Sequence, residues 1–326
     1  MSRSKIGGCL ETVVAFAAIW TVAVVLIAQP NPYHRVDNWE KVAPGFQWGT
    51  IAAVVPDGQD NLWVLQRGDP PILKFDKSGQ LLKTLGDGLF ALPHGLFIQP
   101  DGSLWVVDSG PFTERGRVPG KGTQVFKLDQ NGKVLLTLGK PNTPQAGPDT
   151  FLGPTGVAVN DRGEIFVADG HTPRPGPQDG DRIVKFSKEG TFLQTWGRKG
   201  SGPGDLSGPH GIMLDRRGRL LVADRDNHRV QVFDQNGNYL THWMQYARPS
   251  GIWVDDDDLL YVAHNADPEK TLAGWPFGIR IGSAKDGTLT AFIPGLENEV
   301  VGVDHHGAVY SGGVKALYKF VKNEAR

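Results

Sequence analysis

A short unit of alternating apolar and polar residues, with a tight polar turn near its middle, recurs along most of this chain. Its copies are spaced about 50 residues apart, a period typical of β-propeller blades. The six copies span residues 49–66, 93–108, 154–169, 209–224, 249–264 and 298–312. We therefore expect an all-β fold, a six-bladed propeller.

Each copy begins a group of four short strands, except the last, which supplies three. A lone strand candidate, HRVDNWEKV, precedes the first copy at residues 34–42 and resembles the final strand of the other groups. We expect this N-terminal strand to complete the sixth blade, because closing the ring removes exposed sheet edges that would otherwise template aggregation.

Glycine and proline are abundant, at 43 and 23 of 326 residues, and the repeats explain where they lie. Four Pro-x-Gly triplets, at 93–95, 154–156, 209–211 and 249–251, open the innermost strands. Single glycines close the tight turns, where we expect them to adopt positive φ. These turn glycines are Gly58, Gly102, Gly132, Gly190 and Gly237.

The first 29 residues differ from the repeats. Residues 10–28 are apolar except for Glu11, Thr12 and Thr21, and Arg3 and Lys5 precede them. This pattern predicts a signal anchor (a transmembrane helix) or a cleaved signal peptide, with the rest of the chain exported. We expect residues 1–29 to form this segment, 30–44 a linker with the ring-closing strand, and 45–326 the propeller.

The predicted location is therefore extracytoplasmic, in a periplasm or at the cell exterior. The protein would be membrane-anchored there, or secreted if the segment is cleaved. The single cysteine, Cys9, precedes the apolar run, so the exported part cannot contain a disulfide. A formal net charge of −1 gives no electrostatic reason to expect a nucleic-acid partner. We expect a monomer that binds a small-molecule or peptide substrate.

Long connections between second and third strands mark one face of the predicted ring. They span residues 109–123, 170–181 and 264–278, and by strand parity they lie on the face where the innermost strands begin. Long loops on one face of a rigid scaffold commonly carry function. We call this the long-loop face and expect the substrate to bind there.

At this face the residue after the recurrent proline should point into the central channel. Around the ring these positions are Thr50, His94, Thr155, His210, Ser250 and Glu299. Metal-capable side chains thus alternate with small hydroxyl residues. Two histidines and a glutamate with one open position form a catalytic-zinc ligand set. The alternative is a ring of inner-strand residues hydrogen-bonded around a wet channel.

Two groups of motifs carry a family resemblance. The run VADRDNHRVQVFDQNGNYL, at 222–240, resembles the NHL repeat family. The pieces RGD (67–69), LPHGL (92–96), PTGVAV (154–159) and GPHGI (208–212) are similar to the peptidyl-α-hydroxyglycine α-amidating lyase domain.

The lyase resemblance implies metal ligands. It implies a zinc on three histidines, two of which match His94 and His210, with Glu299 at the third place. It also implies a calcium bound by backbone oxygens at Ala52 and Leu96, although Val300 replaces an adjacent family aspartate.

The same resemblance implies catalytic residues. Arg67 and Arg225 match two family arginines, and Arg67 would hold the substrate carboxylate. The family's catalytic tyrosine is absent, and His171 is the candidate base in its place. The alternative for both arginines is a salt bridge to an aspartate at a strand end: Asp108, Asp169 or Asp224.

The resulting hypothesis is an exported, metal-dependent carbon–nitrogen lyase that releases glyoxylate and an amide. Two alternatives stay open. One is a non-enzymatic propeller that binds a protein or glycan through the long-loop face. The other is a calcium-dependent, lactonase-like hydrolase on the same fold.

Overall fold

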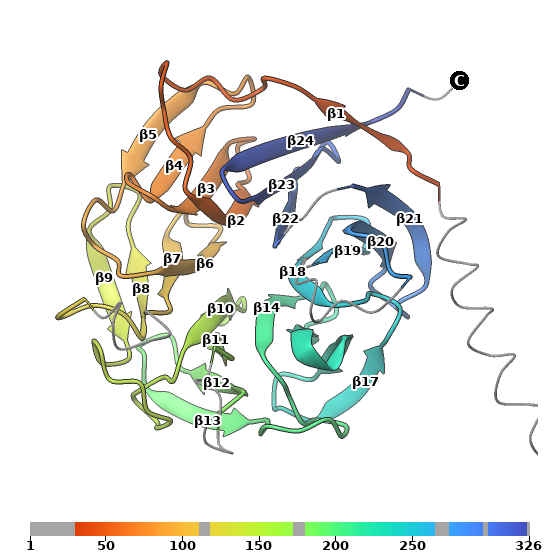
Figure 1. Cartoon of the computed structure of the whole chain (residues 1–326). Helices are drawn as coiled ribbons and strands as arrows, with labels where there is room; N and C mark the ends of the chain where they lie inside the picture. Colours follow the sequence, from red (N-terminus) through yellow and green to blue (C-terminus); the bar gives the residue numbers. More distant parts are fainter. Residues whose placement is uncertain (1–29, 111–117, 172–179, 265–273, 296–298, 325–326) are drawn as a thin grey trace, which may run out of the picture.

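Six four-stranded antiparallel sheets are arranged around a central axis in the computed structural model of the protein (Figure 1). The structure describes residues 30–110, 118–171, 180–264, 274–295 and 299–324. Within these residues, the innermost strand of each sheet contacts the innermost strands of the sheets on either side. The prediction of an all-β, six-bladed propeller is therefore confirmed.

The blades follow chain order, each running from the channel outward. Blades 1 to 3 comprise β2 (Thr50–Pro56), β3 (Leu62–Arg67), β4 (Ile72–Phe75), β5 (Leu81–Leu85); β6 (Pro93–Ile98), β7 (Leu104–Asp108), β8 (Gln124–Leu128), β9 (Val134–Leu138); β10 (Pro154–Val159), β11 (Ile165–Asp169), β12 (Arg182–Phe186) and β13 (Phe192–Trp196). Blades 4 to 6 comprise β14 (Pro209–Leu214), β15 (Leu220–Asp224), β16 (Arg229–Phe233), β17 (Tyr239–Trp243); β18 (Pro249–Val254), β19 (Leu259–His264), β20 (Gly278–Ser283), β21 (Leu289–Pro294); β22 (Val300–Val303), β23 (Val309–Gly313), β24 (Ala316–Lys322) and β1 (Tyr33–Val36). A single turn of 3-10 helix, η2 (Arg225–Asn227), follows β15.

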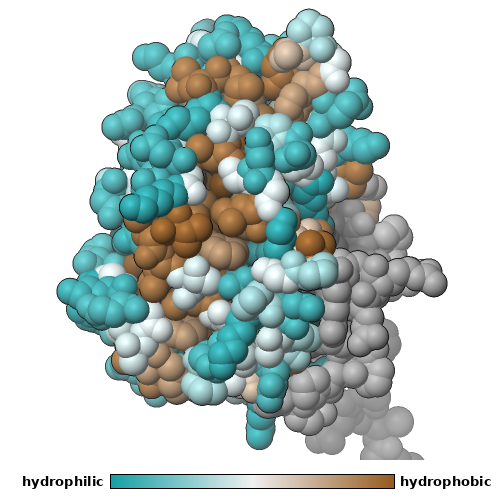
Figure 2. Space-filling view, turned by 90° about the vertical axis from the view of Figure 1, so that its left-hand side faces the viewer, coloured by the Kyte–Doolittle hydropathy of each residue, from teal (hydrophilic) through white to brown (hydrophobic). Residues whose placement is uncertain are grey.

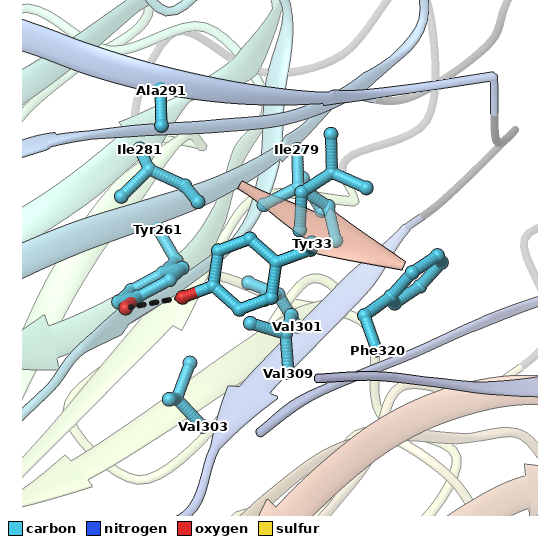
Figure 3. Close-up of a cluster of buried hydrophobic side chains, with 11 residues drawn as sticks. Tyr33, Tyr261, Ile279, Ile281, Ala291, Val301, Val303, Val309 and Phe320 are labelled. Carbon is cyan, nitrogen blue, oxygen red and sulfur yellow. Dashed lines mark hydrogen bonds between the residues drawn. The ribbon is translucent and has the colours of Figure 1, made fainter. Parts of the chain in front are cut away.

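The N-terminal strand closes the ring, as predicted. Strand β1 pairs antiparallel with β24, with Tyr33 opposite Lys322. Figure 3 shows Tyr33 inserted among buried side chains of blades 5 and 6, and its hydroxyl lies 3.3 Å from that of Tyr261. One N-terminal strand and three C-terminal strands therefore form the same blade, so the closure depends on segments that are far apart in the sequence.

Burial falls from the second strand of each blade to its rim. The second strands are almost wholly buried, whereas the outer strands β5 and β13 alternate between exposed and half-buried residues. Leu82, Leu135 and Leu193 of the outer strands are about half exposed. Figure 2 shows the apolar surface among polar side chains on one side of the disc. The core thus lies between neighbouring blades, where it holds the inner strands rigidly around the channel.

The tight turns follow the prediction with one exception. Gly102, Gly132, Gly190 and Gly237 have φ between 81° and 86°. The prediction for Gly58 is wrong, because the residue with positive φ in that turn is Asp60, at 62°.

The hydrogen bonds of this first turn explain the exception. Asp60 donates its amide to the carbonyl of Asp57, as Gly102 does to Gln99. Gly58 is therefore the second residue of its turn, whereas Gly102 is the fourth residue of the equivalent turn.

Among the residues described, no helix is long and apolar enough to cross a membrane. The predicted anchor, residues 1–29, lies outside that part of the chain.

Candidate metal centre in the channel

The Pro-x-Gly triplets place their middle residue in the channel through a local irregularity of the strand. Where β6, β10, β14 and β18 begin, the pairing with the second strand shifts register just after the proline. Such a bulge takes a residue out of the regular ladder and redirects its side chain. His94, Thr155, His210 and Ser250 all line the channel, which has a volume of about 150 Å³.

The glycine of each triplet allows neighbouring inner strands to approach closely. A Cβ added to Gly156 would lie 2.7 Å from the carbonyl oxygen of His210, and one on Gly95 would lie 2.7 Å from that of Thr155. Any larger residue would push the strands apart. The triplet therefore controls both the direction of the middle side chain and the width of the ring.

Three histidine rings meet at one side of the channel. His94 and His171 bring their Nε2 atoms within 2.8 Å, and the His94 and His210 ring centroids are 4.6 Å apart. One nitrogen from each ring lies within 4.8 Å of the other two. This spacing lets the three rings serve as ligands of one metal ion.

Hydrogen bonds on the far side of two rings orient them. His94 Nδ1 donates to the carbonyl of Thr155 at 2.8 Å, and His210 Nδ1 lies 3.0 Å from the Ser250 hydroxyl. Because its Nδ1 donates to a carbonyl, His94 carries its lone pair on Nε2, which faces His171. The Ser250 contact holds the His210 ring beside them. This is the arrangement by which proteins orient metal-binding imidazoles.

The neutral charge of these rings, and a ring nitrogen that lacks a hydrogen bond, also suit the binding of a cation. Burial and the positive charge of Arg67 lower the pKa of His94 to about 3. Burial and Arg225 lower the pKa of His210 well below its usual value. Both rings are therefore neutral at pH 7, with lone pairs available. His210 Nε2 is buried without a hydrogen-bond partner, and an atom of this kind needs a ligand to compensate its desolvation.

The third histidine differs from the predicted ligand set. We expected Glu299 at the third place and His171 as a catalytic base. Among the described residues, the group that can hold a metal consists of His94, His171 and His210. Glu299 lines the same channel but is outside this group. His171 follows β11 at the start of a long connection, and its amide donates to the carbonyl of Gly153.

The sequence carried a signal for His171 that the prediction did not use. The residue opens the 170–181 connection, which parity assigns to the face where the innermost strands begin. Parity therefore places a histidine at that point on the face of His94 and His210, without showing how closely it approaches them. The orienting contact from Ser250 to His210 was also missed, although the hydroxyl itself was located.

The two predicted arginines lie close enough to the histidine group to affect its titration. Arg67 ends β3, donates to the carbonyl of Pro93 at 3.4 Å, and lines a second cavity of about 290 Å³. Arg225 begins η2, and its Nε lies 4.0 Å from Asp226. Both positive charges lower the pKa of His94.

The strand-end aspartates have other partners than these arginines. Asp169 pairs with Arg182 at 3.1 Å, and Asp224 pairs with Arg229 at 2.7 Å. Asp108 accepts backbone amides of the loops beside it. These carboxylates hold loops in place.

The two residues assigned to a backbone calcium site line the same channel. Ala52 lies at a register shift in β2, and Leu96 lies within β6 beside the equivalent shift. Val300 also lines the channel, at the place of the missing family aspartate. The calcium stays a prediction.

Comparison with known proteins supports the repeat assignment. The NHL repeat family matches residues 151–174 and 206–233. NHL repeat-containing protein 3 of Mus musculus is 30% identical over 318 residues, covering 91% of this chain and 86% of that protein.

A lyase relative also matches, over a shorter range. Peptidyl-alpha-hydroxyglycine alpha-amidating lyase 1 of Drosophila melanogaster is 34% identical over 180 residues. The match covers 50% of this chain and 29% of that protein's length. The predicted resemblance to this lyase family is confirmed.

Among solved structures, a gluconolactonase from Xanthomonas campestris superposes with a TM-score of 0.63 at 15% identity, covering 85% of this chain and 87% of that one. At this identity the likeness shows the fold alone. The six blades, the matched repeats and the identity to NHL repeat-containing protein 3 over most of both chains together show that this chain belongs to the NHL repeat family.

Proposed function

We propose that this protein is a metal-dependent lyase that cleaves the carbon–nitrogen bond of an α-hydroxyglycine compound to release an amide and glyoxylate. The observation that supports it is the group of His94, His171 and His210 at the channel mouth, in a chain similar to an amidating lyase. Three imidazoles leave a coordination position open, as in catalytic rather than structural zinc sites.

The residues that would hold the metal are the three histidines. When bound there, zinc or another divalent transition metal would polarise the hydroxyl oxygen of the substrate. The chain contributes the orientation of that site, because Thr155 and Ser250 hold the rings of His94 and His210 in place. It also contributes a narrow channel with little room for bulk water.

Arg67 is suited to bind the substrate carboxylate. It lines the second cavity, and its positive charge is near enough to lower the pKa of His94. A planar guanidinium binds a carboxylate through two parallel hydrogen bonds, which would fix the direction of the scissile bond. Arg225 adds a second positive charge near the group.

Glyoxylate release is the test of this function. The purified protein, loaded with zinc, is incubated with an N-acyl-α-hydroxyglycine, and glyoxylate and amide are measured before and after chelation. We expect stoichiometric formation of both products, lost on chelation and restored by zinc. Hydrolysis of sugar lactones without glyoxylate, or no turnover of either substrate class, would instead favour the lactonase or the binding-module alternative.

Export, membrane attachment through residues 1–29 and a bound calcium are further proposals. The first two rest on the charge and hydropathy of the N-terminal sequence. The calcium rests on the match at Ala52 and Leu96.

A further inference from the structure

Glu299 belongs to the same ring of residues as His94 and His210. Along the inner strands, a Cβ added to each triplet glycine would contact the carbonyl of the ring residue in the next blade. For Gly211 this carbonyl belongs to Ser250, at 2.5 Å, and for Gly251 it belongs to Glu299, at 2.7 Å. Glu299 therefore lies at the level of the histidines, immediately before β22 in blade 6.

The histidine group lies on one side of this ring. His94 and His210 come from blades 2 and 4, and His171 comes from the connection that leaves blade 3. In the circular order of the inner strands, blade 6 lies opposite blade 3 (Figure 1). Glu299 thus lines the channel across from the group and outside its 4.8 Å cluster.

A carboxylate in that position complements the chemistry of the site. With His171 among the potential ligands, the proposed reaction needs another group to move a proton. Glu299 is the ring residue with a carboxylate, and its charge acts on Arg67, the residue assigned to the substrate carboxylate. The carboxylate in the channel and the guanidinium beside it are therefore near enough for their charges to interact.

We propose that Glu299 is the catalytic base of this lyase, an inference that rests on the function proposed above. Its carboxylate takes the proton from the substrate hydroxyl. The O–H electron pair forms the carbonyl of glyoxylate, and the C–N electron pair leaves with the nitrogen. The carboxylic acid then returns the proton to that nitrogen, giving the amide with no net gain or loss of protons.

Substitution of Glu299 separates this role from metal binding. In Glu299→Gln we expect a metal content equal to that of the wild type, a KM changed by less than about threefold and a kcat lowered by about 100-fold or more. In Glu299→Gly we expect added formate to restore part of kcat in proportion to its concentration, because formate can occupy the vacated space and accept the proton. Glu189→Gln, an exposed carboxylate on a tight turn of blade 3, is the matched control and should behave as the wild type.

Three outcomes would overturn the assignment of Glu299 while leaving the proposed function in place. Wild-type kcat in Glu299→Gln would show that no base is lost. Metal loss in Glu299→Gln would make Glu299 a ligand. Absence of formate rescue in a Glu299→Gly protein with wild-type circular dichroism and metal content would leave only a structural role. A wild-type protein that releases no glyoxylate would overturn the proposed function itself, and the assignment with it.

Discussion

The hydroxyl of Ser250 is the clearest case of a single side chain that orients a candidate metal ligand. It is fully buried, and its oxygen lies 3.0 Å from His210 Nδ1. A contact of this kind orients the ring, and its loss typically weakens metal binding 10- to 100-fold. Ser250 thus orients its neighbour His210 through its hydroxyl, whereas Thr155 orients His94 through its backbone carbonyl.

Ser250→Ala should therefore weaken metal binding by about 10- to 100-fold without unfolding the protein. Competition with a chromogenic chelator measures the dissociation constant. Thr155→Val is the matched control, because His94 uses the backbone carbonyl of Thr155 and the hydroxyl donates to Pro209 instead. Its metal affinity should stay within about threefold of the wild type; equal affinities in all three proteins would contradict the orienting role.

The turn between β10 and β11 is an element whose stability depends on one carboxylate. Glu164 accepts hydrogen bonds from Asn160 and Arg162 at 2.6 Å each, and Lys185 lies 3.0 Å from its other oxygen. Burial alone would raise the pKa of Glu164, but these donors outweigh it and hold the pKa at about 2. The ionised form is thus favoured in the folded state.

This shift predicts a pH-dependent contribution to folding. Because the folded pKa lies below the unfolded value of 4.5, the contribution is complete above pH 4.5 and is lost as the pH falls toward 2. Glu164→Gln should lower the free energy of unfolding by about 1–2 kcal/mol at pH 7, and by less at pH 2.5. Urea unfolding at both pH values measures this loss of free energy. Substitution of the exposed neighbour, Asp161→Asn, is the control. A difference in free energy of unfolding between the wild type and Glu164→Gln that is as large at pH 2.5 as at pH 7 would contradict the account.

Turns also show where sequence reasoning fails. The Asp57-Gly58 pair resembles Asp101-Gly102, yet the two glycines occupy different places in their turns, and Asp60 takes the positive φ. An Asp-Gly pair in the sequence does not show which position of the turn its glycine occupies, because that position depends on the hydrogen bonds of the turn. The strands on either side were predictable, because their alternation is set by burial on the blade faces.

At the scale of the whole molecule, a closed ring with two unlike faces determines where chemistry can occur. The repeat period predicted the blades, and the missing fourth strand of the last copy predicted closure by β1. Strand parity correctly grouped His171 with the face that carries His94 and His210. Its entry into the histidine group was not predictable, because the path of a long connection is not determined by the period of the repeat.

The most direct test of the central claim is the metal content of single histidine variants. Elemental analysis after zinc loading and gel filtration should find about one zinc per chain in the wild type. Less than a tenth of that should remain in His94→Ala, His171→Ala and His210→Ala. His306→Ala, an exposed histidine on a tight turn of blade 6, should retain the full amount. A wild type that retains no zinc, or a His171→Ala protein that retains as much as the wild type, would contradict a three-histidine metal centre in this channel.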